Sequence, residues 1–191
     1  GQFHTALTDT SIYISSDFGN NWTNKGITGG VTVSVSASGK YQTLGVYGGY
    51  IYISSDFGNN WTSKETVHAW ASVSVSASGQ FQTAVVYDGY IYISSDYGNN
   101  WNATATESLR HWQGVSISAS GQYQTAVAYN GQIYISSDYG NTWTPKASSL
   151  GWQAVSISAA GQYQTAVIYN GQIYISSDFG DTWTPKESVD R

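Results

Sequence analysis

Residues 134–143 read YISSDYGNTW, and this stretch decides the fold because the chain contains it five times in nearly the same form. The other copies begin at Tyr13, Tyr52, Tyr92 and Tyr174, and their aspartates follow at steps of 39, 40, 42 and 40 residues. A fixed period of this length is typical of repeat proteins in which each repeat is one supersecondary unit. We therefore number five repeat units, which span approximately 1–30, 31–69, 70–111, 112–151 and 152–191.

Within each unit the sequence alternates as a β-strand does. Residues 112–119 alternate apolar and polar side chains with a period of two, which predicts a first strand. Residues 123–129 and 133–136 predict the second and third strands, and a short fourth follows beside Trp143. We expect Asn130–Gly131 to form a two-residue hairpin turn in which both residues have positive φ. Helical periodicity appears nowhere.

Four strands in about 40 residues, repeated along the chain, are typical of a β-propeller blade. The sequence predicts an all-β fold, a five-bladed β-propeller of four-stranded antiparallel blades. The first blade lacks its own inner strand, because the first copy opens at Gly1, after the place where that strand would lie. We count 19 strands where five complete blades need 20. Either the ring closes without that strand, or further sequence or a neighbouring subunit supplies it.

The five copies share the pattern Ser-x-Asp-x-Gly-x-x-Trp. Its residues are Ser15, Asp17, Gly19 and Trp22; Ser54, Asp56, Gly58 and Trp61; Ser94, Asp96, Gly98 and Trp101; Ser136, Asp138, Gly140 and Trp143; and Ser176, Asp178, Gly180 and Trp183. The pattern resembles the Asp-box, or bacterial neuraminidase repeat, S-x-D-x-G-x-T-W, over essentially the whole chain. Three copies depart from it, with Asn21, Asn60 and Asn100 at the Thr position. In the resembled family these turns lie on the face opposite the ligand site, which implies a structural role here.

The chemistry of the turn favours the same interpretation. A short Asp side chain accepts hydrogen bonds from backbone N–H groups of its own turn. Gly permits a conformation that a Cβ would forbid, and Trp adds a large apolar face with one N–H donor. A calcium site around Asp17, Gly19 and Asn20 is the alternative, but EF-hand spacing is absent. We expect no metal.

Sialidases also carry Asp-boxes, and the resemblance implies three arginines around the substrate carboxylate. This chain has only Arg110 and Arg191. A two-carboxylate glycosidase needs acids roughly 5–10 Å apart, and the acids outside the Asp-boxes recur at no common position. They are Asp9, Glu65, Asp88, Glu107, Asp181, Glu187 and Asp190. His4, His68 and His111 also occupy different repeat positions, which argues against a metal cluster. We predict no enzyme and no cofactor, with a small polar site at Arg110 and His111 as the alternative.

The composition of the chain argues against nucleic acid and the membrane interior as partners. Net charge is −5 and only seven residues are Lys or Arg, which excludes a nucleic-acid groove. No apolar run approaches the roughly 20 residues that a membrane helix needs, so we expect no membrane insertion. Cysteine is absent, which leaves the compartment undecided. Localisation is unknown, and an extracellular or cell-surface place is favoured for a natural protein.

Aromatic residues recur on the face where, by analogy with other propellers, a ligand would bind. Tyrosines precede the hairpin turns, and tryptophans stand at the entrance to the inner strand. They are Tyr47, Tyr87, Tyr129 and Tyr169, and Trp70, Trp112 and Trp152. Such rings suit sugar stacking or protein interfaces, which makes these residues candidates for ligand contact. The alternative is that they pack between adjacent sheets.

Two functions remain. In the first, the chain is a structural, assembly or protein-interaction module that self-associates through its incomplete first blade. In the second, it is a multivalent carbohydrate-binding propeller with one shallow glycan site per repeat. The near identity of the repeats also suits an amplified or engineered repeat protein.

Overall fold

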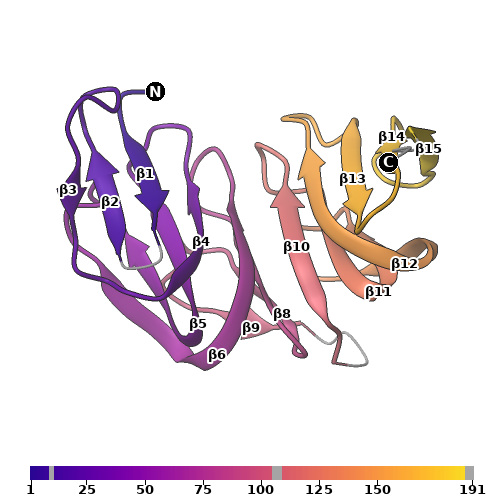
Figure 1. Cartoon of the computed structure of the whole chain (residues 1–191), viewed down its shortest axis with the longest axis horizontal. Coiled ribbons are helices and arrows are strands. Elements are labelled where there is room, and N and C mark those ends of the chain that lie inside the picture. The colour runs from indigo at the N-terminus through magenta and orange to yellow at the C-terminus, as the bar shows by residue number, and fades with distance from the viewer. Residues whose placement is uncertain (9–10, 105–108, 188–191) are drawn as a thin grey trace.

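The computed structural model describes residues 1–8, 11–104 and 109–187, and these residues form strands and turns without a helix. The strands form three antiparallel sheets, β1–β3, β4–β9 and β10–β15 (Figure 1). Their bounds are β1 His4–Leu7, β2 Ile12–Ser15, β3 Thr23–Asn24, β4 Gly30–Val35, β5 Gln42–Ser54, β6 Thr62–Val75, β7 Gln82–Val86, β8 Ile91–Ser94, β9 Asn102–Ala103, β10 Trp112–Ile117, β11 Gln124–Ser136, β12 Thr144–Ile157, β13 Gln164–Ile168, β14 Ile173–Ser176 and β15 Thr184–Glu187. The predicted all-β class is confirmed.

Four long strands each serve two positions of the repeat. The first part of β6 pairs with β5, and its second part, from Trp70 onward, pairs with β7. Strand β12 links β11 to β13 in the same way. The last strand of one unit therefore continues into the first strand of the next. Strands β5 and β11 run through the bend between the second and third predicted strands.

The turn at that bend differs from the expected one. Asn130 has a φ of 52°, but Gly131 does not have a positive φ, so the prediction that both residues of Asn130–Gly131 are left-handed is wrong. The third unit shows the reason. The Gly89 N–H donates to the Val86 carbonyl at 3.0 Å, so the turn is centred one residue earlier, on Tyr87 and Asp88. Glycine is needed at this position for a different reason: a Cβ on Gly89 would lie only 2.5 Å from the Val86 side chain.

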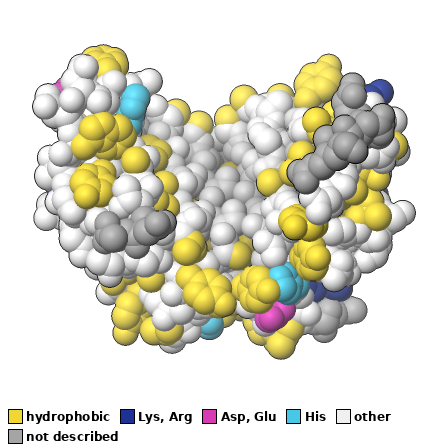
Figure 2. Space-filling model, in the orientation of Figure 1, with side chains coloured by type: hydrophobic (Ala, Val, Ile, Leu, Met, Phe, Trp, Pro, Cys, Tyr) yellow, Lys and Arg dark blue, Asp and Glu magenta, His cyan; other side chains and the backbone are white. Residues whose placement is uncertain are grey.

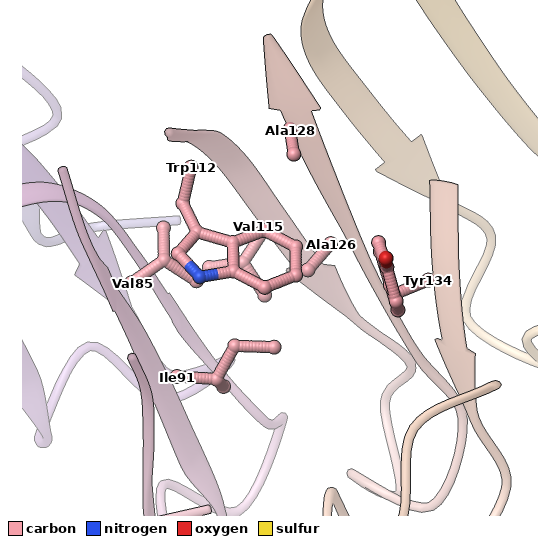
Figure 3. Close-up of a cluster of buried hydrophobic side chains, with 7 residues drawn as sticks. All are labelled: Val85, Ile91, Trp112, Val115, Ala126, Ala128 and Tyr134. Atoms are coloured by element: carbon pink, nitrogen blue, oxygen red, sulfur yellow. The ribbon is translucent and has the colours of Figure 1, made fainter. Parts of the chain in front are cut away.

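The hydrophobic core lies between successive units rather than within them. Each of its four clusters joins residues of one unit to residues of the next. In the cluster of Figure 3, Trp112 lies among Val85 and Ile91 of the third unit and Ala126 and Tyr134 of its own. Burial of large side chains at these junctions supplies the main stabilisation of each unit against its neighbour.

The units follow one another along an arc with two arms. In Figure 1 the strands β1–β9 form one arm and β10–β15 the other, and Figure 2 shows the open gap between the two arms. Successive units pack through their first strands, β4 on β6, β6 on β10 and β10 on β12. Among the described strands, no packing of that extent joins β1–β3 to β13–β15. The two ends of the arc therefore each leave one face without a neighbouring unit.

Candidate functional site

Each Asp-box forms the same hydrogen-bonded turn. In the fourth unit the Ser136 hydroxyl donates to Asp138 Oδ1 at 2.8 Å, and the Thr142 N–H donates to the same oxygen at 2.9 Å. The Thr142 hydroxyl donates to Asp138 Oδ2 at 2.6 Å. The Trp143 indole N–H donates to the Gly140 carbonyl at 2.8 Å. All the donors to this carboxylate come from its own turn, so the geometry suits bracing of the backbone.

Asparagine replaces threonine without loss of these bonds. In the first unit the Asn21 N–H donates to Asp17 Oδ1 at 2.9 Å and its amide donates to Oδ2 at 2.6 Å. These hydrogen bonds lower the pKa of Asp17 to about 2, and the bond from the Asn21 backbone N–H has the largest effect. Those from the Thr182 hydroxyl and backbone lower the pKa of Asp178 to about 2. The carboxylates therefore stay charged over the whole physiological range.

The candidate tryptophans belong to the core. Trp70, Trp112 and Trp152 are all 0% exposed. The Trp70 indole N–H donates to Gly49 and that of Trp112 to Gly89, each at 3.1 Å. Because these three side chains are buried, they cannot contact a ligand at the surface. They pack between adjacent sheets instead, which was the alternative interpretation.

The tyrosines before the bends are accessible and form a row across four units. Tyr47 and Tyr169 are exposed, and Tyr87 and Tyr129 are half-buried. Tyr87 meets Tyr47 with ring centroids 6.5 Å apart. Strand registers place this tyrosine row at the opposite end of the strands from the Asp-box turns, because Gln164 pairs with Ser176 at one end and Val167 with Ile173 at the other. Figure 2 shows hydrophobic side chains along the lower rim of the molecule.

His111 sits in the middle of the tyrosine row. Its ring lies 3.7 Å from the ring of Tyr87 and 5.5 Å from that of Tyr129, and its Nδ1 is 3.3 Å from Asp88 Oδ1. A shallow hollow of about 280 Å³ opens here. It is lined by Tyr87, His111, Gln113, Tyr129, Gln153 and Tyr169. Arg110 takes no part, because its guanidinium lies over the Tyr134 ring at 4.6 Å. The hollow thus offers flat rings, two amides and an imidazole.

Asp88 and Asp181, the acidic residues outside the Asp-boxes whose side chains are described, do not line this hollow. Asp88 pairs with His111, and Asp181 pairs with Lys146 at 2.9 Å. No three His, Asp or Glu side chains of the described residues gather as a metal site requires. Asp9, Glu107, Asp190 and Arg191 lie outside the described residues, as do the side chains of Glu65 and Glu187. The described part of the chain also contains no helix with the length and apolar character needed to cross a bilayer.

A network of side-chain hydrogen bonds between the units was not predicted from the sequence. The Thr43 hydroxyl donates to Gln82 Oε1 at 2.5 Å, and the Gln82 amide donates to the Gly79 carbonyl at 3.0 Å. The same Thr–Gln bond joins Thr83 to Gln124 and Thr125 to Gln164, at 2.7 Å in both cases. The recurrence of Gln and Thr in GQYQTAV was the signal for it.

Comparison with known proteins shows the fold alone. No protein-family model and no curated protein matches the sequence. A GH74 enzyme of Niastella koreensis matches 96% of this chain with TM-score 0.69 at 15% identity. YCF48 from Cyanidioschyzon merolae matches 95% with TM-score 0.67 at 17% identity, over 65% of its own length. A chain of a nidogen/laminin complex matches 100% with TM-score 0.75 at 11% identity, over 80% of its length. This chain spans 30% of the GH74 enzyme. The likeness gives the chain a β-propeller type of fold.

Proposed function

We propose that the chain is a non-enzymatic binding and assembly module that holds a partner protein on its tyrosine row. In this proposal each repeat unit is one blade, so that the chain contributes five blades, and the Asp-box turns brace them on the opposite face. The observation that carries the proposal is the hollow at His111, where rings from the third, fourth and fifth units come together. Tyrosine and histidine without a charged lining resemble the core of a protein interface.

The same hollow argues against hydrolysis. Cleavage of a glycosidic bond requires two carboxyl groups facing each other across the substrate. The residues that line the hollow contain none. His111 is held against Asp88, but no Ser, Thr or Cys nucleophile lines the hollow beside it. The residues therefore suit binding rather than catalysis.

The first blade offers a second place for a partner. Strand β1 pairs with β2, from His4↔Ser15 to Leu7↔Ile12. In the next unit the matching strand β5 pairs on its other edge with β4. No described strand occupies that edge of β1. An extended segment of a partner would add there by backbone hydrogen bonding.

A glycan is the second candidate ligand for the tyrosine row. The side-chain amides of Gln113 and Gln153 stand beside exposed ring faces in the hollow. This combination of stacking surface and amide hydrogen bonds also suits sugar hydroxyl groups. The similar structures include both GH74 enzymes and a protein–protein complex, so the fold leaves the ligand class open.

The test is cross-linking of the tagged chain in its native extract, alongside a glycan array. Tyr129→Ala/Tyr169→Ala removes two rings from the hollow. Tyr50→Ala is the matched control, because it removes a tyrosine that is 44% exposed and lies outside the row. We expect one protein cross-link to be lost in the double variant and kept in the control. Loss of a glycan instead would establish the second candidate. Ligands unchanged by the double variant would refute both.

A further inference from the structure

Every junction between successive units is built from the same contacts. An aromatic ring of one unit lies against the ring that follows the Asp-box aspartate of the next, as in Tyr123 against Phe179 at 4.5 Å. The other such pairs are Phe3–Phe57, Tyr41–Tyr97 and Phe81–Tyr139, at 4.3 to 4.6 Å. A Thr hydroxyl donates to a Gln of the next unit, and an isoleucine at the start of the third strand is buried between the two units.

In the last unit, the residues that form one side of this junction are exposed. Tyr163, which is equivalent to Tyr123, is 61% exposed. Thr165 is exposed, whereas its equivalent Thr125 is 0% exposed. Ile173 is 37% exposed, although the isoleucines at this position in the four earlier units are 0% exposed. We call these three side chains the donor face.

The first unit carries the other half. Phe18, which is equivalent to Phe179, is 69% exposed. His4 occupies the position that Gln holds in the other units. Its Nε2 lies 2.7 Å from the Gly1 carbonyl, just as the Gln42 amide donates to Gly39 at 3.0 Å. A carbonyl oxygen only accepts, so Nε2 carries the hydrogen and Nδ1 of the neutral ring is left as an acceptor. Phe18 and His4 form the acceptor face.

We propose that the donor face of one copy binds the acceptor face of a second copy, head to tail. In this contact Tyr163 stacks on Phe18 of the partner copy, and the Thr165 hydroxyl donates to Nδ1 of the partner copy's His4. At four junctions within the chain, equivalent surfaces of successive units already fit each other. Closure onto the chain's own first unit would bring together faces on opposite arms of the arc (Figure 2), and the existing junctions would have to change. A second copy leaves them as they are.

The contact between copies contains fewer bonds than an internal junction. Within the chain, first strands also meet; for example, the Ile157 N–H donates to the Ser116 hydroxyl at 3.2 Å. The equivalent Ser156 is exposed, and the first unit brings no described first strand to meet it. We therefore expect reversible association that depends on concentration. Because the two faces differ, the contact is heterologous and extends into rings or chains of copies.

The experiment is analytical ultracentrifugation of two blocked variants, alone and mixed. Tyr163→Lys blocks the donor face, and Phe18→Lys blocks the acceptor face. Tyr50→Lys is the control, since Tyr50 is 44% exposed and lies outside both faces and the tyrosine row, at a position that is Gln in the fourth and fifth units. All three side chains are exposed, and circular dichroism checks that each variant keeps its fold.

We expect the mass of the unmodified chain and of Tyr50→Lys to rise with concentration, and each blocked variant alone to stay monomeric. An equimolar mixture of the two blocked variants should form a dimer and nothing larger, because it contains one open donor face and one open acceptor face per pair. A monomeric unmodified chain, a blocked variant that still associates, or a mixture that stays monomeric would overturn the proposal. This test does not involve the proposed partner of the tyrosine row, so the two proposals fail independently.

Discussion

The junctions between units should control stability, and two equivalent isoleucines test this. Ile133 is 0% exposed in the cluster with Val127, Trp152 and Ala166, whereas Ile173 is 37% exposed. Ile133→Ala removes three buried carbons, worth about 2.4 kcal/mol of transfer free energy at about 0.8 kcal/mol each. The cavity left behind adds to this, so we expect a loss of about 3–4 kcal/mol in the free energy of unfolding.

For Ile173→Ala we expect about 1.5 kcal/mol or less, because part of the side chain is already hydrated and solvent fills the vacated space. The assay is urea unfolding followed by tryptophan fluorescence, at a protein concentration low enough to keep the chain monomeric. The midpoint should move much further for Ile133→Ala, with unchanged slopes. Equal losses would show that the core does not lie at the junctions, and the reasoning would fail.

Three further outcomes follow from the hydrogen bonds. Thr125→Val leaves a buried Gln164 oxygen without its donor and should cost about 1–3 kcal/mol, whereas Thr165→Val should stay within about 0.5 kcal/mol by calorimetry. Asp138→Ala removes the acceptor of three turn bonds and should cost about 1–2 kcal/mol in urea unfolding; a loss no larger than that of Asp138→Asn, which keeps one acceptor oxygen, would contradict the bracing role. The Asp17 and Asp178 carboxyls have a pKa of about 2 in the folded chain against an ordinary 3.8, so their stabilisation is present above about pH 4 and is lost as pH falls towards 2. Melting temperature should therefore drop across that window, and a flat profile would contradict it.

The sequence predicts what is local. The positions of the second and third strands follow from a period of two and from the recurring Asp-box, and both are properties of short segments. The bend is centred one residue earlier than the Asn-Gly pair predicts, as the third unit shows, and the reason is a close contact within the bend that turn propensity does not describe. Asn-Gly favours a turn of its own, but Gly131 is needed because a Cβ there would lie 2.8 Å from the Ala128 side chain.

The candidate site was harder to predict because contacts between units are separated by about a whole repeat. Trp112 and Tyr129 recur with the same regularity, and periodicity alone could not tell which of them is buried. The Thr125–Gln164 bond joins residues 39 positions apart, so the recurring GQYQTAV segment marks both residues without showing that they are bonded to each other. The ring contacts and the hollow at His111 show which of the described aromatic rings meet at the surface.

The residues of the first and last units bear on the proposed association between copies. In a repeat protein each unit contacts only its neighbours, and terminal units normally carry a polar outer face as a cap. Here the last unit keeps Tyr163 and Ile173 where internal units have them, and the first keeps Phe18. The one departure is His4, which still supplies an acceptor at the Gln position. The first and last units of this chain thus keep the contact residues of an internal junction, which is what the proposed association between copies requires.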